Sequence, residues 1–215
     1  MPDLISDRLL IRPFRMDDLD AAYQLLDIDL ADADTGNSGP ITRAERERRL
    51  LWATMNYGEL ADLYQPPYGD RAIELRETGE LVGSAGFVPC LGPFGQLPAF
   101  TSGDSEQSPF FSTEFGLYWA VAPARQRQGY ATEAGRALID YAFSTLNLHR
   151  VVATTTYDNE PSLAVMRKLG MDIYRNPRSE PFWFQAVGVI LNPLLQARAA
   201  EPHYFDPPAT STRAP

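Results

Sequence analysis

The segment from residue 113 to residue 157 constrains the fold most, because its apolar pattern predicts a strand, a helix and a second strand in succession. The strands are expected at Thr113–Val121 and Val151–Tyr157, and the helix at Ala131–Leu146. A crossover of this kind is right-handed and makes the two strands parallel neighbours in one sheet. The segment therefore predicts an α/β protein. The buried face of the helix is expected to carry Ala134, Leu138, Tyr141 and Ala142.

The rest of the chain predicts further strands. They are expected at residues 9–12, 71–77, 81–88 and 182–191. The second and third of these flank Gly79 and are expected to form a hairpin. Residues 90–112 contain several glycines and prolines and predict a long loop, a feature that is often functional in a compact domain.

Helix signals occur at three further places. Residues 19–28 have helical apolar spacing, and residues 161–169 predict a short helix. Thr42, with Glu45 three residues later, is expected to begin a helix that runs to about Tyr57, because this pair forms a capping box.

The junction between the strand at 113–121 and the following helix has the sequence RQRQGYATEA. A helix N-terminus leaves about four backbone N–H groups without partners and carries partial positive charge, a combination that suits phosphate. Gly129 allows a ligand to approach the backbone closely, and Gln126 and Arg127 can add donors. A glycine that merely fits a tight turn is equally compatible with this spacing. The junction matches neither a P-loop nor a dinucleotide-binding G-x-G-x-x-G sequence.

Several motifs around this junction form a recognisable set. Gln126-x-x-Gly129-x-Ala131 matches the Q/R-x-x-G-x-G/A motif of the GNAT superfamily of acetyl-CoA-dependent N-acetyltransferases. Residues 7–13 and 115–119 are similar to the first strand of that family and to the strand before its motif. Residues 159–162 and 168–171 resemble the N-x-x-S…K-L-G-F element of the RimJ/RimL-like branch. The resemblance extends from about residue 7 to residue 192.

The resemblance implies a GNAT fold, in which a mixed, twisted sheet is split between the two central parallel strands and carries helices on both faces. Acetyl-CoA is the expected cofactor. Its pantetheine is expected in the split, along the backbone of Trp119 to Val121, and its pyrophosphate on the N–H groups at the start of the helix. The expected cofactor contacts are Trp119, Val121, Gln126, Arg127, Gln128, Gly129, Tyr130, Ala131, Thr132, Asn159 and Ser162.

Acetyl transfer to an amine requires that the amine lose a proton, that an oxyanion be stabilised and that the thiolate receive a proton. The resemblance makes Glu114 the candidate general base and a backbone N–H near Val121 the oxyanion donor; an ordinary solvated carboxylate is the alternative for Glu114. Many relatives place a tyrosine seven residues after the position of Asn159, but this chain has Met166 there, which cannot donate a proton. Ser162 is the next candidate donor, and a helix N-cap is its alternative role.

The composition and charge of the chain argue against several classes of partner and site. The formal net charge is −9, so nucleic-acid binding is not expected. Cys90 is the single cysteine, and the two histidines lie far apart, so neither an internal disulfide nor a zinc site is expected. No apolar run is long enough to span a membrane and no signal peptide is expected, which favours a cytoplasmic protein.

We expect one domain over residues 1–200 and a proline-rich tail over residues 201–215. The resemblance implies an acetyltransferase that acts on a protein N-terminus or on a small amine such as an amino acid, a polyamine or an aminoglycoside. The chain is expected to be a monomer or a homodimer. A non-catalytic acyl-CoA-binding regulatory protein with the same fold is the alternative function.

Overall fold

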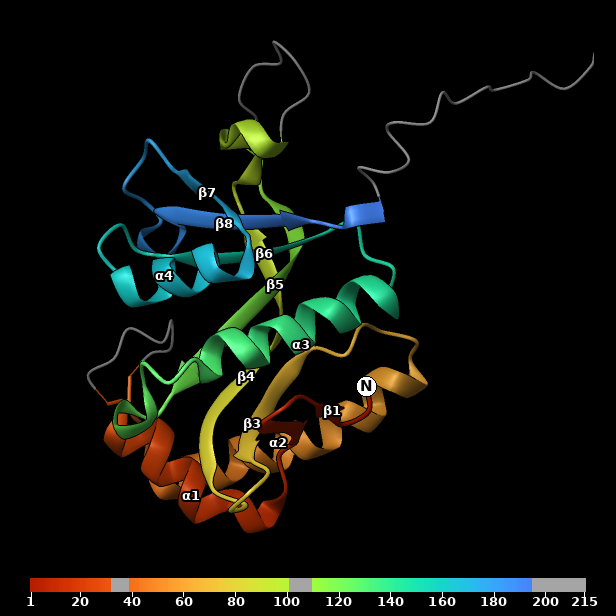
Figure 1. Ribbon diagram of the computed structural model, residues 1–215, viewed down its shortest axis with the longest axis vertical. Helices are drawn as coiled ribbons and strands as arrows, with labels where there is room; N and C mark the ends of the chain where they lie inside the picture. Colours follow the sequence, from red (N-terminus) through yellow and green to blue (C-terminus); the bar gives the residue numbers. More distant parts are fainter. Residues whose placement is uncertain (32–38, 101–109, 195–215) are drawn as a thin grey trace, which may run out of the picture.

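The computed structural model describes residues 1–31, 39–100 and 110–194 of the 215-residue chain. These residues form one eight-stranded sheet (Figure 1). The strands are β1 (Leu4–Ile5), β2 (Leu9–Pro13), β3 (Gly69–Leu75), β4 (Leu81–Gly92), β5 (Ser112–Val121), β6 (Arg150–Thr155), β7 (Asp172–Arg175) and β8 (Ala186–Leu191). Their order across the sheet is β1-β2-β3-β4-β5-β6-β8-β7. Every neighbouring pair is antiparallel except β5 and β6, so the mixed α/β fold class is confirmed.

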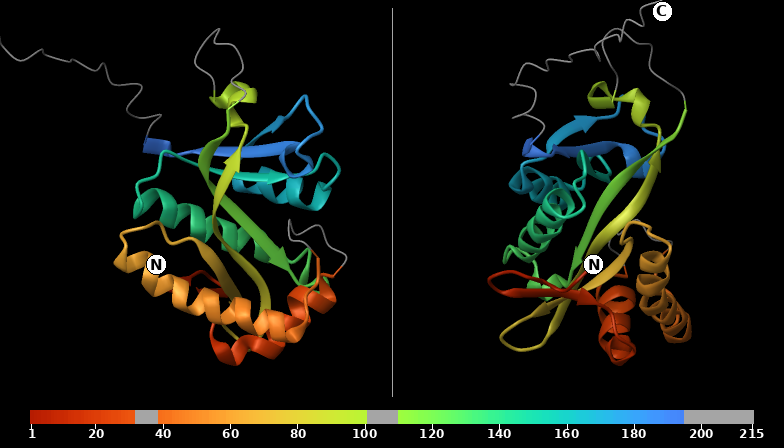
Figure 2. Two further views of the ribbon diagram at one scale, coloured as in Figure 1. Left: turned by 180° about the vertical axis from the view of Figure 1, so that it is seen from behind. Right: turned by 90° about the vertical axis from the view of Figure 1, so that its right-hand side faces the viewer.

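Within the described residues, four α-helices cover the two faces of the sheet (Figure 2). They are α1 (Leu19–Tyr23), α2 (Arg43–Asp62), α3 (Tyr130–Ser144) and α4 (Glu160–Leu169). Helices α3 and α4 bury the largest hydrophobic core against one face. Helices α1 and α2 cover the other face through a smaller core that contains Phe14, Leu19, Ala22, Leu50 and Ala72.

Helix α2 begins as its sequence predicts. The Thr42 side chain accepts a hydrogen bond from the Glu45 N–H, and the Glu45 carboxylate accepts one from the Thr42 N–H at 2.9 Å. The capping box satisfies two donors that a helix start leaves unpaired. The helix continues to Asp62, five residues beyond the predicted end. Helix α1 is followed directly by a π-helical segment, Gln24–Asp29, so the predicted helix over residues 19–28 is confirmed in extent.

The sheet is split between β5 and β6. The two strands are paired at a single position, where Gly116 lies opposite Val152, and they diverge beyond it. Gly116 also packs so tightly against β4 that a Cβ there would lie 2.8 Å from Cγ2 of Val88. The strand–helix–strand unit β5–α3–β6 therefore has the parallel connection that its sequence predicts, but the two strands leave a gap towards their carboxyl ends.

Two predicted elements differ from the structure, and strand β7 is an addition to the prediction. The long loop expected over residues 90–112 is wrong at its start, because β4 continues to Gly92, and Phe94 and Leu97 are fully buried against Phe184; residues 101–109 of this loop lie outside the described residues. The strand expected at 182–191 begins at Ala186, since Phe182–Phe184 forms a short 3₁₀ turn after Pro181. Strand β7 was not predicted, because its four residues are only partly buried and give no alternating pattern.

Two further expectations concern the C-terminal tail and membrane-spanning segments. The predicted tail, residues 201–215, lies outside the described residues. In the described part of the chain, no helix is both long enough and apolar enough to cross a membrane.

Candidate functional site

The start of helix α3 is shaped as an anion site. Gly129 precedes the helix with a φ of +87°, in the left-handed region that glycine adopts without strain. Arg127, two residues earlier, also has a positive φ, of 61°. No side chain caps the first turn of α3, so its N–H groups are available to a ligand. An uncapped helix start after left-handed residues is a backbone arrangement that binds phosphate.

A groove of about 600 Å³ runs from this helix start to α4. All the predicted cofactor contacts line it except Gln128. The backbone carbonyl of Gln128 instead accepts a hydrogen bond from Nη1 of Arg8 at 3.0 Å, which ties the loop to β2. The structure thus gathers residues from β5, the junction and α4 around one groove, and it places Gln128 outside the lining.

Two of the groove residues also hold the junction in place. Nε2 of Gln126 donates a hydrogen bond to the carbonyl of Val121 at 3.1 Å, which fixes the loop to the end of β5. Tyr130 is buried, and the guanidinium of Arg8 stacks on its ring, with Cζ 4.6 Å from the centroid. These contacts keep the start of α3 aligned with the split.

Positive charge borders the groove at three places. Arg125 is paired with Glu80 at 2.5 Å, whereas Arg127 and Lys168 have no ion-pair partner among the described residues. Lys168 was not among the predicted site residues. Its helical spacing from Pro161 and Ala164, which also line the groove, is the signal that could have identified it.

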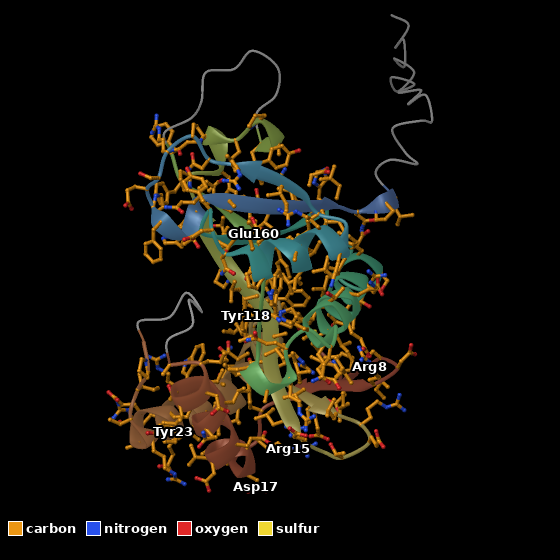
Figure 3. The ribbon with its side chains drawn as sticks, turned by 60° about the vertical axis from the view of Figure 1, so that its left-hand side comes forward. Arg8, Arg15, Asp17, Tyr23, Tyr118 and Glu160 are labelled. Carbon is orange, nitrogen blue, oxygen red and sulfur yellow. The ribbon has the colours of Figure 1, made fainter. Side chains whose placement is uncertain are left out.

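Two smaller cavities continue from the groove. One of about 310 Å³ lies in the split and shares Trp119, Asn159 and Ser162 with the groove. The other, of about 210 Å³, lies between the sheet and helices α1 and α2, and shares Trp119, Asp70 and Tyr118 with the cavity in the split. We call them the split cavity and the helix cavity. Tyr118 stands midway between the two halves of the molecule (Figure 3).

The start of helix α4 borders both the groove and the split cavity. The side chain of Asn159 caps this helix by accepting a hydrogen bond from the Ser162 N–H at 3.2 Å. The N-cap alternative for Ser162 is therefore wrong. The Ser162 hydroxyl has no hydrogen-bond partner in the part of the chain that the structure describes, and it faces the point where the groove meets the split cavity. Met166, at the position where relatives have a tyrosine, is fully buried.

Glu114 is engaged in an ion pair. Both of its carboxylate oxygens accept hydrogen bonds from the Arg150 guanidinium, at 2.5 and 2.8 Å, which joins β5 to β6 on the amino-terminal side of the Gly116–Val152 pairing. Its side chain is 11% exposed. Glu114 does not belong to the lining of the groove or of either cavity. Its predicted role as a general base stays a prediction, and the pairing gives it a structural contact that the sequence did not indicate.

Sequence reasoning missed a second carboxylate, that of Asp70 at the start of β3. Asp70 lies opposite Gly86 of β4, and Gly86 lies opposite Tyr118 of β5, so the three residues form one row on the face covered by α2. The Tyr118 hydroxyl lies 3.0 Å from Oγ of Ser84, and the Asp70 carboxylate is close enough for its charge to act on the phenol. Burial and the nearby Asp70 charge raise the pKa of Tyr118 well above its usual value, so this phenol stays protonated.

Cys90 also lines the split cavity. Burial raises the pKa of its thiol to about 11, so the group stays protonated at neutral pH and is a poor nucleophile. The described residues contain no group of three or more histidine, cysteine or acidic side chains that could hold a metal ion.

Comparison with known proteins gives a consistent result. The family model described as an acetyltransferase (GNAT) domain matches residues 8–172. The uncharacterized N-acetyltransferase YnaD of Bacillus subtilis is 29% identical over 168 residues, which cover 78% of this chain and 81% of YnaD. The crystal structure of an acetyltransferase from Agrobacterium tumefaciens is 28% identical, with a TM-score of 0.61 over 88% of this chain and 94% of that one. A RimL ribosomal L7/L12 N-acetyltransferase in complex with coenzyme A has the same fold, at 14% identity and a TM-score of 0.59, over 87% and 95% of the two chains.

Proposed function

The chain belongs to the GNAT family of acetyltransferases, and we propose that it transfers the acetyl group of acetyl-CoA directly to a primary amine. In this reaction a nitrogen–carbon bond forms and the carbon–sulfur bond of the thioester breaks. The amine gives up one proton and the sulfur receives one. The acceptor is a small-molecule amine or a protein N-terminus, the latter being the group that the name of the RimL neighbour specifies for that protein.

The observation that carries this proposal is the meeting of the groove and the split cavity at Trp119, Asn159 and Ser162. A reaction between two substrates requires their reacting atoms to be held in contact. The groove offers one substrate a phosphate-binding helix start, and the split cavity offers the second substrate a separate approach. The two spaces adjoin only where the sheet is split.

The residues of the groove fit acetyl-CoA, which when bound supplies the acetyl thioester. The uncapped first turn of α3 suits the pyrophosphate, and Arg127 and Lys168, which form no ion pair within the described part of the chain, suit the remaining phosphate. Beyond Gly116, the β5 edge that faces β6 is not paired in the sheet and can hydrogen-bond the amides of an extended ligand. The Ser162 hydroxyl, which has no hydrogen-bond partner among the residues that the structure describes, lies where the groove meets the split cavity and is the candidate that gives a proton to the sulfur.

A charge at Gly129 tests the placement of the cofactor. Acetyl-CoA at 100 times its Kd should stabilise the wild type by about 2.7 kcal/mol, which raises the Tm by about 5–10 °C. Gly129→Glu should abolish this shift, because its carboxylate would stand in the phosphate position. Gly129→Gln is the matched control, since it imposes the same backbone strain and similar bulk without the charge, and it should retain part of the shift.

An undiminished shift in Gly129→Glu would place the cofactor elsewhere. Release of free thiol from acetyl-CoA in the presence of a panel of primary amines then tests transfer itself. If the protein binds acetyl-CoA but releases no thiol from it in the presence of any amine of the panel, the proposed reaction is contradicted and a non-catalytic acyl-CoA-binding protein is favoured.

A further inference from the structure

We propose that Asp70 binds the ammonium group of the acceptor, and that this acceptor is a small amine with one positive charge on an apolar body. The inference rests on the proposed function, because it assigns the second substrate of the same site. It names the residue that recognises the amine and the class of amine that the cavities fit.

Asp70 occupies the position that an acceptor must reach. It borders both the split cavity and the helix cavity, and its residue surface is exposed. Among the described residues, it is the only acidic one in the lining of either cavity. A primary amine arrives in water as an ammonium ion, and a carboxylate is the strongest partner that a protein side chain offers to it.

The side chain of Asp70 lies beside that of Tyr118. A Cβ at Gly86 would lie 2.1 Å from the carbonyl oxygen of Gly69 and 3.2 Å from Cε1 of Tyr118, so only glycine fits between the two outer residues of the row. The Tyr118 side chain therefore reaches across Gly86 to Asp70. Its protonated hydroxyl lies near the carboxylate, to which it can donate a hydrogen bond, and it lies 3.0 Å from Oγ of Ser84. One hydrogen bond of this kind leaves the remaining acceptor sites of Asp70 for the amine.

The backbone at this position is also fixed. The hydroxyl of Tyr57, on α2, donates a hydrogen bond to the carbonyl of Asp70. Helix α2 thus fixes the backbone of Asp70, and Tyr118 of β5 lies beside its side chain. A residue whose backbone is already fixed loses less conformational freedom when an ammonium group binds to it.

The charges around the helix cavity select against acceptors with several positive charges. Arg46 and Arg49 both line it. Arg46 is neutralised by Asp27 through two hydrogen bonds of 2.7 and 2.9 Å, whereas Arg49 has no ion-pair partner among the described residues. A polyamine anchored at Asp70 would bring its next ammonium group towards these arginines, and juxtaposed like charges are destabilising.

The rest of the lining is suited to an apolar body. Phe14, Leu26, Leu50 and Trp52 come from the α1 and α2 side, and Trp119 from the sheet. Cavities of about 310 and 210 Å³ match the size of a small ligand. Phenethylamine, with one ammonium group and one aromatic ring, is the probe that represents this class, and spermidine represents the excluded class.

Calorimetry with phenethylamine tests the anchor without turnover. The wild type should bind the amine in the presence of coenzyme A, and Asp70→Asn should weaken this binding about 10- to 100-fold, the range for a hydrogen bond to a charged group. Asp70→Glu should recover part of the affinity, because it keeps the charge. Asp172→Asn, at an exposed position on β7, is the matched control and should bind like the wild type.

Steady-state kinetics test the same residue during acetyl transfer. Asp70→Asn should raise the KM for phenethylamine by a similar factor, while the Kd for acetyl-CoA stays within about twofold of the wild-type value. Tyr118→Phe, which removes a positioning contact, should raise the KM less and leave the affinity for acetyl-CoA unchanged. The wild type should use spermidine with a lower kcat/KM than phenethylamine.

Three results would overturn the inference: no binding of phenethylamine by the wild type, equal binding by Asp70→Asn, or a higher kcat/KM for spermidine. A protein that does not bind acetyl-CoA would instead contradict the proposed function. Because calorimetry measures the amine separately from acetyl-CoA, the two failures are distinguishable.

Discussion

Replacement of Glu114 by glutamine separates the two roles that this residue could have. The sequence makes Glu114 a candidate general base, whereas the structure pairs both of its oxygens with Arg150. Glutamine keeps the size of the side chain and one acceptor oxygen but removes the charge. As a general base, Glu114 would be needed for turnover, and its loss would lower kcat by about 10²-fold or more. As an ion-pair partner, it would be needed for stability.

The magnitude of the stability effect follows from the burial of the pair. The side chains of Glu114 and Arg150 are 11% and 25% exposed. Exposed ion pairs contribute about 0–1 kcal/mol, and removal of one partner of a fully buried pair costs about 3–5 kcal/mol. The pair lies between these cases, so Glu114→Gln should cost about 2 kcal/mol and lower the Tm by about 4–8 °C. The Arg150 guanidinium, which also lies 4.3 Å from the centroid of the Phe100 ring, would be left without its counter-charge.

A double-mutant cycle with Arg150→Met measures the coupling directly. We expect the two single variants to be destabilised, and the double variant to lose less stability than the sum of the two. We expect kcat for Glu114→Gln to stay within about tenfold of the wild type, well short of the loss of a general base. A 10²-fold fall in kcat with an unchanged Tm would refute this reasoning and establish Glu114 as the base.

The remaining predictions concern residues at the N-terminal ends of helices α4 and α3. Asn159→Ala should lower stability by about 1 kcal/mol because it removes the cap of α4, whereas Ser162→Ala should leave the Tm unchanged and lower kcat by about 10²-fold; wild-type turnover in Ser162→Ala would exclude the serine as a proton donor. Burial raises the pKa of Glu133, but hydrogen bonds from Arg8 and Ser6 and the Arg8 charge outweigh it and lower the pKa below 4.5. The stability that Glu133 contributes is therefore present above pH 4.5 and is lost as the pH falls through its lowered pKa. The Tm difference between wild type and Glu133→Gln should be larger at pH 7 than at pH 3, and an equal difference at both would contradict this assignment.

The lining of the groove, where we propose that the cofactor binds, was largely predictable because its residues are close together in the sequence. The end of β5, the junction and the first turn of α3 form one continuous segment, and α4 adds a second. The left-handed φ of Gly129 and the uncapped helix start follow from local backbone rules. The structure differs from the sequence analysis in this region at individual contacts. Asn159, three residues before Ser162, is the helix cap, and Gln128 lies outside the groove, because local sequence does not determine which neighbouring side chain faces a ligand.

Long-range packing accounts for the errors elsewhere. The apolar segment Phe182–Phe184 has the composition of a strand, but Phe184 is buried against Phe94, at an angle of 84° between the two rings, and the backbone turns to allow this contact. The same cluster contains Leu97, which explains why part of the segment predicted as a loop is buried. A core formed by segments about 90 residues apart leaves no periodic pattern in either of them.

Asp70 illustrates the limit of sequence reasoning most clearly, because its position depends on the register of two strand pairs. The pairing of β3 with β4 contains an irregularity at Ile73 and Glu74, and only beyond it does Asp70 lie opposite Gly86. A shift of one residue would turn every side chain of that part of β3 to the opposite face. It would place Arg71, which is fully buried beneath the sheet, where the carboxylate now meets Tyr118. The proposed acceptor side of the site is thus determined by strand register, whereas the proposed cofactor side is determined by a single continuous turn.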